Sequence, residues 1–384
     1  MLQTFKDIID ILSAPTVSFT LLTIAFPFVF PPTDWFEKIH RKFGICRLWT
    51  KPGFYGGMIA ITFFFVVGYF DPNFNITLTK ADNFPIILMI YSMFIAIWWS
   101  MYQAYQNDDR LENGLKPMEY NDPDDKVLVW PDLVYIEFIA LILFMVFLIV
   151  WSILVAAPLE EPANPAATPN PSKAPWYFLG LQEMLVYFDP WIAGIIFPIF
   201  IIIGMMAIPY MDINKKGDGY YSFKERRIGM FIFMYGWVVL WLFLIVIGTF
   251  FRGPNWNFFG PFEYWTPYKV EVLNNVDLPQ MFWVQWLNQP LPRAPQDAGL
   301  LSQIGYILMR ESPGLLVMGV YLVALPPLMA VTIFRGFYAK MGFIRYMVMS
   351  NLMLLMLTLP LKMALRWTLN LKYIISIPEF SLNF

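Results

Sequence analysis

Histidine and cysteine are nearly missing from this sequence of 384 residues, which has one of each, His40 and Cys46. One histidine cannot supply the two axial imidazoles of a membrane b-haem. One cysteine excludes an internal disulfide, a CxxCH haem attachment and a four-cysteine iron–sulfur site. No second metal ligand is spaced beside either residue, so we expect a solvated histidine and an ordinary thiol. The chain is therefore expected to have no redox centre of its own.

Charge is also scarce. Only 14% of the residues are charged, against roughly 25% in ordinary soluble domains. Hydrophobic residues make up 58% of the chain and aromatic residues 19%, a composition that suits lipid-facing surfaces and interfacial belts. The 26 basic and 28 acidic residues nearly balance, which gives no argument for nucleic acid as a partner. These counts predict a polytopic protein in contact with membrane lipid.

Apolar stretches that approach the roughly 20 residues of a spanning helix occur eight times. We therefore expect an all-α, polytopic transmembrane helical protein with about eight spans. The stretches are Pro15–Phe30, Phe54–Phe70, Pro85–Tyr102, Leu133–Ala156, Trp191–Met211, Ile228–Phe251, Gly314–Phe334 and Tyr346–Leu365. The first is the weakest, because it is short and contains Pro27. Before it, apolar residues recur at helical spacing from Leu2 to Leu12, which predicts a short helix on the membrane surface.

Lysine and arginine are unevenly distributed between the two sides of these spans. One side gathers Lys38, Arg41, Lys42, Arg47, Lys51, Arg110, Lys116, Lys126, Lys215, Lys216, Lys224, Arg226, Arg227, Arg335, Lys340 and Arg345. The short segments of the other side contain only Lys6, Lys80 and Lys173. The positive-inside rule then places both termini and the segment Glu160–Asp189 on the external, positive side of a cell inner membrane, whether cytoplasmic or energy-transducing.

Composition changes divide the chain into three parts. We expect a three-span region with a surface helix at residues 1–126, a three-span middle at 127–251 and a two-span region at 252–384. The last part opens with the external stretch Arg252–Ser312, which is rich in Pro, Trp, Tyr and Asn. That stretch is either an interfacial loop or a docking surface for an external partner.

The middle part contains five short motifs in order around its three spans. They are Val129-Trp-Pro-Asp-Leu-Val-Tyr-Ile136, Glu161-Pro-Ala-Asn-Pro-Ala-Ala-Thr-Pro169, Ala174-Pro-Trp-Tyr-Phe178, Ile208-Pro-Tyr-Met-Asp212 and the basic turn that follows. This order resembles subunit IV of cytochrome b6f-type complexes, which corresponds to the C-terminal domain of cytochrome b. The resemblance covers roughly Val127 to Phe251 and does not extend to the flanking parts.

The resemblance implies a membrane subunit of a quinol:cytochrome c, or other acceptor, oxidoreductase of the bc or b6f type. In that family the external loop with the Pro-Glu-Trp-Tyr motif lines the pocket where quinol is oxidised. The quinone site is shared with a haem-bearing, b6-like cytochrome b subunit, which holds the b-haems. A Rieske iron–sulfur protein and a c-type cytochrome carry electrons onward. The scarcity of histidine fits this arrangement, and the chain alone is expected to be inactive.

The family glutamate is replaced in this sequence. Aligned on Trp176 and Tyr177, its position is occupied by Pro175. A quinol-oxidising site needs a group that accepts a proton, and a partly buried carboxylate can do this. Glu183, about two helical turns further on, is our candidate proton acceptor, and Pro175, Trp176, Tyr177 and Phe178 are candidate quinol-binding residues. The alternatives are an interfacial Glu183 that pairs with Lys173 or solvent, and aromatic residues that merely anchor the helix.

Two other functions compete with quinol oxidation. A structural or assembly subunit of a respiratory or photosynthetic complex would explain the loss of the glutamate at Pro175 and the unmatched flanking parts. A secondary transporter ranks low, since such proteins usually show inverted repeats and interrupted helices in matching halves, which this sequence lacks.

Overall fold

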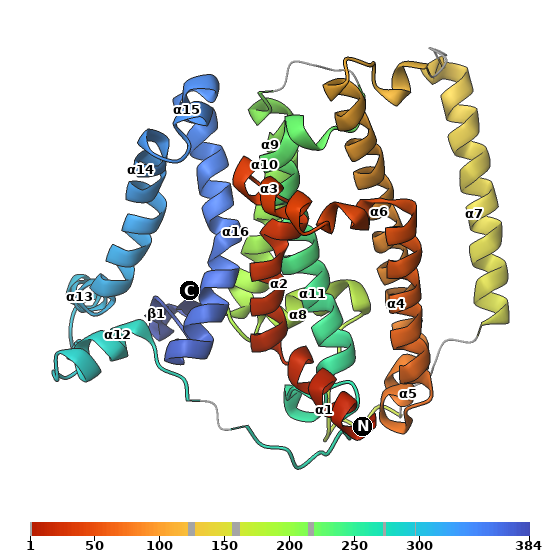
Figure 1. Ribbon diagram of the computed structural model, residues 1–384. Helices are drawn as coiled ribbons and strands as arrows, with labels where there is room; N and C mark the ends of the chain where they lie inside the picture. The colour runs from red at the N-terminus through yellow and green to blue at the C-terminus, as the bar shows by residue number, and fades with distance from the viewer. Residues whose placement is uncertain (1, 122–126, 156–161, 214–218, 272–273, 296) are drawn as a thin grey trace. The chain divides into compact units, whose positions relative to one another are not determined.

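The computed structural model describes residues 2–121, 127–155, 162–213, 219–271, 274–295 and 297–384. Within these ranges the chain is mostly helical (Figure 1), and its strands are one antiparallel pair, β1 (Ser376–Ile377) and β2 (Leu382–Asn383). The predicted all-α fold is confirmed. Some residues of the predictions lie outside the described residues, namely Lys126, Ala156, Glu160, Glu161, Lys215 and Lys216.

Most of the helices follow one another closely, and longer connections precede η5 and α12. The α-helices are α1 (Leu2–Ser13), α2 (Pro15–Val29), α3 (Asp34–Lys42), α4 (Lys51–Tyr69), α5 (Pro72–Leu78), α6 (Phe84–Glu112), α7 (Val134–Leu154), α8 (Leu179–Met184), α9 (Phe197–Met211), α10 (Phe223–Met234), α11 (Phe243–Val246), α12 (Leu278–Gln280), α13 (Leu300–Gly319), α14 (Leu325–Val331), α15 (Arg335–Met341) and α16 (Phe343–Leu369). Short 3₁₀ or π segments join or extend them: η1 (Ile45–Trp49), η2 (Ala81–Asn83), η3 (Met118–Asn121), η4 (Val129–Leu133), η5 (Trp176–Phe178), η6 (Ile192–Ile196), η7 (Tyr235–Leu242), η8 (Ile247–Phe251), η9 (Pro254–Trp256), η10 (Met281–Trp286), η11 (Val320–Ala324) and η12 (Pro378–Phe380).

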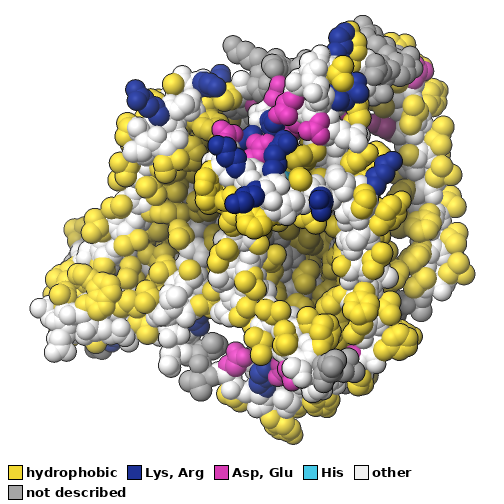
Figure 2. Space-filling model, viewed as in Figure 1, with side chains coloured by type: hydrophobic (Ala, Val, Ile, Leu, Met, Phe, Trp, Pro, Cys, Tyr) yellow, Lys and Arg dark blue, Asp and Glu magenta, His cyan; other side chains and the backbone are white. Residues whose placement is uncertain are grey.

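Seven helical segments of the described ranges are long and apolar enough to cross a membrane. They are Lys51–Tyr69, Ala81–Glu112, Val129–Leu154, Ile192–Met211, Phe223–Phe251, Leu300–Val331 and Phe343–Leu369. Each overlaps a predicted span. Figure 2 shows hydrophobic side chains over most of the visible face, an exposed apolar surface of the kind that contacts lipid. The chain is a multi-pass membrane protein.

The first predicted span is the exception. Its helix, α2, has 15 residues and contains Pro27, so it is shorter than the roughly 20 residues that a straight crossing needs. A bend of 74° separates it from α1. An eighth span is present only if this bent pair counts as one crossing. The predicted N-terminal helix is present as α1, and its place on the membrane surface stays a prediction.

The chain divides into two compact units. Unit 1 comprises Met1–Ala25, Lys173–Gly217 and Ile232–Phe384, and unit 2 comprises Phe26–Ser172 and Asp218–Phe231. The three-part division of the sequence at residues 126 and 251 stays a prediction.

In unit 1, α16 packs against the broken helix formed by α13, η11 and α14. The fully buried Tyr346 donates from its hydroxyl to the carbonyl oxygen of Pro326 at 3.0 Å. In the same way Tyr321 donates to the carbonyl oxygen of Leu354 at 2.7 Å. These bonds satisfy hydroxyl groups that would be costly to bury without a partner.

In unit 2, α4 packs against α6 through aromatic rings. The ring centroids of Phe54 and Trp98 are 4.5 Å apart, and the rings of Phe54 and Phe94 are stacked at 6.0 Å. A Cβ atom at Gly57 would lie 2.2 Å from the Phe94 ring, so this close approach requires glycine. By contrast, α7 has no buried side chain, and its entire surface is available to lipid or to a partner helix.

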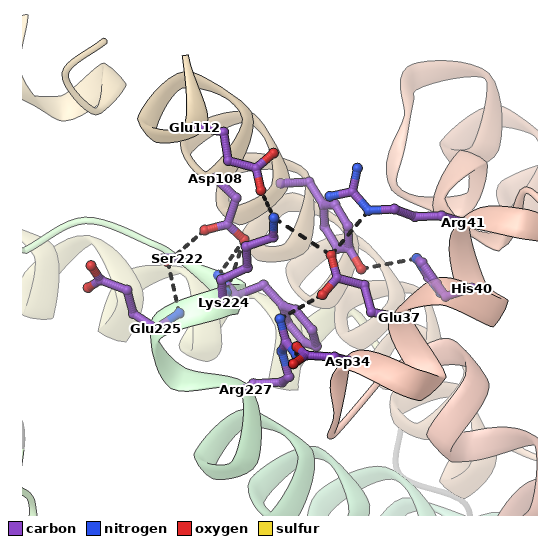
Figure 3. A network of polar contacts seen from close by, with 12 residues as sticks. Asp34, Glu37, His40, Arg41, Asp108, Glu112, Ser222, Lys224, Glu225 and Arg227 are labelled. Atoms are coloured by element: carbon purple, nitrogen blue, oxygen red, sulfur yellow. Dashed lines mark hydrogen bonds and ion pairs between the residues drawn. The ribbon is translucent and has the colours of Figure 1, made fainter. Parts of the chain in front are cut away.

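Polar side chains tie the ends of α3, α6 and α10 together in unit 2 (Figure 3). The buried carboxylate of Asp108 accepts hydrogen bonds from the Ser222 hydroxyl at 2.6 Å and from the backbone N–H groups of Phe223 and Lys224 at 3.1 and 3.0 Å. It thereby satisfies N–H groups in the first turn of α10, which have no partner within the helix.

Candidate functional site

The motif Ala174–Phe178 forms a tight turn in unit 1 that leads into α8. The N–H of Phe178 donates to the carbonyl oxygen of Pro175 at 2.8 Å, which closes the 3₁₀ turn η5. Pro175 itself has no N–H to donate and a fixed φ, so the turn starts in a defined direction. Tyr177 and Phe178 are 49% and 51% exposed, whereas Trp176 is half-buried. The turn thus presents two aromatic rings to its surroundings.

The short helix α8 is anchored on the helix that runs through α11 and η8. Small residues make this contact close. A Cβ atom at Gly180 would lie 3.2 Å from the Ile245 side chain, and one at Gly248 would lie 3.2 Å from the carbonyl oxygen of Leu179. On the N-terminal side of the turn, Lys173 donates to the carbonyl oxygen of Thr249 at 2.7 Å. Both ends of the aromatic turn are therefore fixed to the same helix.

Glu183 is completely buried and held by three hydrogen bonds. Nη2 of Arg252 donates to its Oε1 at 2.5 Å, and Nε of Arg252 donates to its Oε2 at 2.9 Å. The indole Nε1 of Trp256 donates to Oε2 at 3.1 Å. The fork of a guanidinium matches a carboxylate in this bidentate geometry, which makes such pairs the strong ones.

Arg252 connects α8 to the segment that follows the end of η8 at Phe251. Its Nη1 donates to the carbonyl oxygen of Trp256 at 2.9 Å, so the segment folds back around the pair. Burial lowers the pKa of the guanidinium, but the charge and hydrogen bonds of Glu183 more than offset this and raise the pKa above its usual value. Arg252 therefore stays charged at every physiological pH.

The partner of Glu183 differs from the one predicted from the sequence. Lys173, the expected partner in the interfacial alternative, bonds to a backbone carbonyl and places its Nζ 5.0 Å from the centre of the Trp265 ring. Arg252 is the missed residue. The sequence did contain a signal, because Arg252 is a cation directly after an apolar span on the side where basic residues are rare.

Tyr187 lies one helical turn beyond Glu183 and is also buried. Burial first, and then the negative charge of Glu183, raise the pKa of the Tyr187 phenol, so it stays protonated. Its ring packs edge-on against Trp367 at 6.1 Å. The buried surroundings of Glu183 thus contain one guanidinium and one neutral phenol.

A b-haem does not fit the side chains of this chain. The only histidine, His40, is fully buried, and Nδ1 bonds to the carbonyl oxygen of Phe28 at 2.8 Å while Nε2 bonds to the Tyr105 hydroxyl at 3.0 Å. Both ring nitrogens are thus occupied. The prediction of a solvated histidine is wrong. In the part of the chain that the structure describes, no three His, Cys, Asp or Glu side chains gather as a metal site would require.

Comparison with known proteins identifies the segment that contains this site. Residues 162–262 match the family described as cytochrome b (C-terminal)/b6/petD. The match begins after α7 and continues past the end of η8 at Phe251, so it includes Glu183, Arg252 and Trp256. No solved structure matches the chain. The resemblance predicted from the motif order is confirmed, and residues 162–262 carry the signature of the cytochrome b C-terminal family.

Proposed function

We propose that this chain forms part of the external quinol-oxidation pocket of a bc- or b6f-type oxidoreductase, together with a haem-bearing cytochrome b subunit. The observation that carries the proposal is the aromatic turn inside the matched segment. Tyr177 and Phe178 are half-exposed although they are large and apolar. The turn that carries them is fixed at both of its ends to the helix that runs through α11 and η8. Exposed rings on a rigid support suit the packing of a flat ring such as that of a quinol.

In this proposal the residues of the turn and the partner subunits have separate roles. Pro175, Trp176, Tyr177 and Phe178 line the pocket and orient the quinol ring. The b-haems belong to the partner subunit, because the nitrogens of His40 are occupied and no second histidine is present in the sequence. A Rieske iron–sulfur protein and a c-type cytochrome are the proposed electron acceptors, and the turn is proposed to face the external side of the membrane.

The role of Tyr177 and Phe178 is tested in the assembled complex. The double variant Y177A/F178A is expected to lower the quinol-oxidation rate at least about tenfold and to raise KM, as loss of a ring-binding surface worth about 1.4 kcal/mol would do. The complex should still assemble with its b-haem spectrum unchanged. Tyr268→Ala is the matched control, because Tyr268 is an exposed aromatic residue, 88% accessible, outside the matched segment. Unchanged quinol oxidation in Y177A/F178A would refute a pocket at this turn.

Glu183 has two candidate roles that its contacts distinguish. As the proton acceptor, its carboxylate would release one of its three donors when it takes up the proton of the quinol. As a structural brace, it would keep all three bonds and only hold the turn in place, which suits the alternative of a non-catalytic assembly subunit. Its complete burial in a bidentate pair with Arg252 favours the brace.

Glu183→Gln separates these roles, because the amide keeps the shape but cannot hold the same proton. A proton acceptor predicts a slower rate per assembled complex and an altered pH profile of kcat. A brace predicts fewer assembled complexes and a lower Tm, with an unchanged rate in those that do assemble. A dithionite-minus-ferricyanide spectrum of the purified complex quantifies assembly, and the absence of a b-type cytochrome would refute the proposed function altogether.

A further inference from the structure

A basic and aromatic surface lies at the start of the first long span of unit 2. Between Asp34 and Lys51, along α3 and η1, the chain has exposed cations and exposed apolar side chains together. The cations are Lys38, Arg41, Lys42, Arg47 and Lys51. The apolar residues are Trp35, Phe43 and Leu48, which are 61%, 73% and 47% exposed. In Figure 2 dark-blue basic side chains gather over the α3 region. We call this set of eight residues the basic rim.

Of the cations in the basic rim, Arg41 forms an ion pair with an acidic residue of the same segment. Figure 3 shows that the other contacts of these acidic residues are with Arg227 and Lys224 of α10. Asp34 receives Nη1 of Arg227 at 2.5 Å, and Glu37 receives Nη2 of Arg227 at 2.6 Å and Nε of Arg41 at 3.1 Å. Within the described residues, the other four cations of the rim form no ion pair with a carboxylate, namely Lys38, Lys42, Arg47 and Lys51. Their charges are therefore available to a ligand.

An open groove of about 730 Å³ lies within the basic rim. Residues between Gly44 and Gly53 line it, among them Arg47, Leu48 and Pro52. Gly44, at φ +67°, lets the chain turn here, and a Cβ atom at this position would lie 3.7 Å from Nε of Arg47. The groove thus combines an apolar wall with a guanidinium at its edge, and its volume is that of a pocket for a small organic ligand.

We infer that the groove lies at the height of lipid headgroups. Its lining includes Pro52 and Gly53, in the first turn of the spanning helix α4. Exposed Trp and Phe at the end of a span mark the boundary between hydrocarbon and headgroups. The uneven distribution of Lys and Arg predicts that this is the cytoplasmic side, whose leaflet is negatively charged and attracts clusters of basic residues.

We propose that the groove between Gly44 and Gly53 binds an anionic phospholipid, with Arg47 and Lys51 on the phosphate and Leu48 and Phe43 against the start of an acyl chain. The positive charge of the basic rim indicates an anionic ligand. Four cations that no carboxylate pairs select a negative headgroup, and the exposed apolar residues select a molecule that also has a hydrocarbon part. The site lies outside residues 162–262 and is independent of the quinol-oxidation proposal.

Native mass spectrometry and titration of the full chain in detergent micelles test the site. The probes are phosphatidylglycerol, phosphatidylcholine and inorganic phosphate. The double variant R47Q/K51Q removes two cations of the rim, and we expect its affinity for phosphatidylglycerol to fall at least about tenfold, since each cation near an anionic surface contributes about fivefold. R47K/K51R keeps the charge and is expected to retain the lipid.

The matched control is K340Q/R345Q. It removes the same charge from exposed positions on the side predicted to be cytoplasmic, and it is expected to bind phosphatidylglycerol like the wild type. A Tm equal to that of the wild type shows that R47Q/K51Q is folded. Equal retention of phosphatidylglycerol by wild type and R47Q/K51Q would overturn the proposal. So would equal retention of phosphatidylcholine, or displacement of the lipid by inorganic phosphate at similar concentrations.

Discussion

The guanidinium of Arg252 meets the carboxylate of Glu183 in a bidentate pair, with donor–acceptor distances of 2.5 and 2.9 Å. The side chain of Glu183 is 1% exposed and that of Arg252 is 9% exposed. The two residues are 69 positions apart, Glu183 on α8 and Arg252 just after the last span of the matched segment. The pair therefore links the two ends of that segment where little water can screen it.

Breaking this pair from either side leaves the other charge buried. We expect Glu183→Gln or Arg252→Gln to lower the free energy of unfolding by about 3–5 kcal/mol each. The double variant E183Q/R252Q is expected to lose less than the sum of the two, because neither charge is then orphaned, and the coupling should be about 1–3 kcal/mol.

Denaturant unfolding in detergent, followed by tryptophan fluorescence, measures the four members of this cycle. Arg335→Gln, at an exposed position of unit 1, serves as the control for loss of a cation and should change stability by less than about 0.5 kcal/mol. Strictly additive effects of E183Q and R252Q would show that the bidentate pair contributes nothing.

Most of the fold follows from the sequence because lipid imposes simple rules. Apolar runs of about 20 residues must be helices, and seven of the eight predicted spans are present as helices long enough to cross. The bent pair α1–α2 shows where the rule weakens. A run of 15 residues with Pro27 inside is compatible with a crossing, a re-entrant segment or an interfacial helix, and composition cannot distinguish these.

The contacts of single polar residues are much harder to predict. The basic stretch around His40 predicts a solvated ring, yet it is buried between a backbone carbonyl of α2 and the Tyr105 hydroxyl of α6. Likewise, nearness in sequence suggests Lys173 as the partner of Glu183, which instead pairs with Arg252. Tyr105 and Arg252 are distant in sequence from the residues that they contact. A sequence pattern records spacing along one helix and not the packing between separate parts of the chain.

The buried His40 predicts a dependence of stability on pH. Burial lowers the pKa of His40 from the usual 6.5, so the folded protein keeps the ring neutral where the unfolded chain already binds a proton. Stability is therefore complete above about pH 6.5 and falls as the pH decreases below it. Tm in detergent, measured from about pH 7.5 to 5, should decline in the wild type and much less in His40→Gln. Parallel curves would assign the decline to other groups.

Asp108 should stabilise the start of α10 as a cap. Its carboxylate accepts two backbone N–H groups and the Ser222 hydroxyl, so Asp108→Ala leaves these donors without their acceptor. We expect a loss of about 1–2 kcal/mol. The neighbouring Asp109 is exposed and provides the matched control, since Asp109→Ala removes the same group without a cap. Thermal unfolding of the three proteins measures the difference, and equal Tm values for D108A and D109A would contradict the capping role.

Glu379 holds the C-terminal hairpin to α13 in unit 1. Both of its oxygens accept from Arg310, at 2.7 and 2.8 Å, and this hydrogen bonding lowers the pKa of Glu379 to about 2. The unfolded or detached segment has the ordinary value of 4.5 and takes up a proton first as the pH falls. The stabilisation is therefore full above about pH 4.5 and is lost as the pH approaches about 2.

Hydrogen exchange of the backbone N–H of Ser376 reports on this attachment, because that N–H donates to Glu311 at 2.9 Å next to Arg310. After correction for the intrinsic rate, its protection should decrease between about pH 5.5 and 3.5 in the wild type. Glu379→Gln should have lower protection of the Ser376 N–H at about pH 7 and little further change. Arg310 then keeps its bonds to Glu311 at 2.8 Å and to the carbonyl oxygen of Ser376 at 3.3 Å but loses the carboxylate of Glu379. Asp277→Asn, also in unit 1, should behave as the wild type. A steep pH dependence that survives in E379Q would place the titrating group elsewhere.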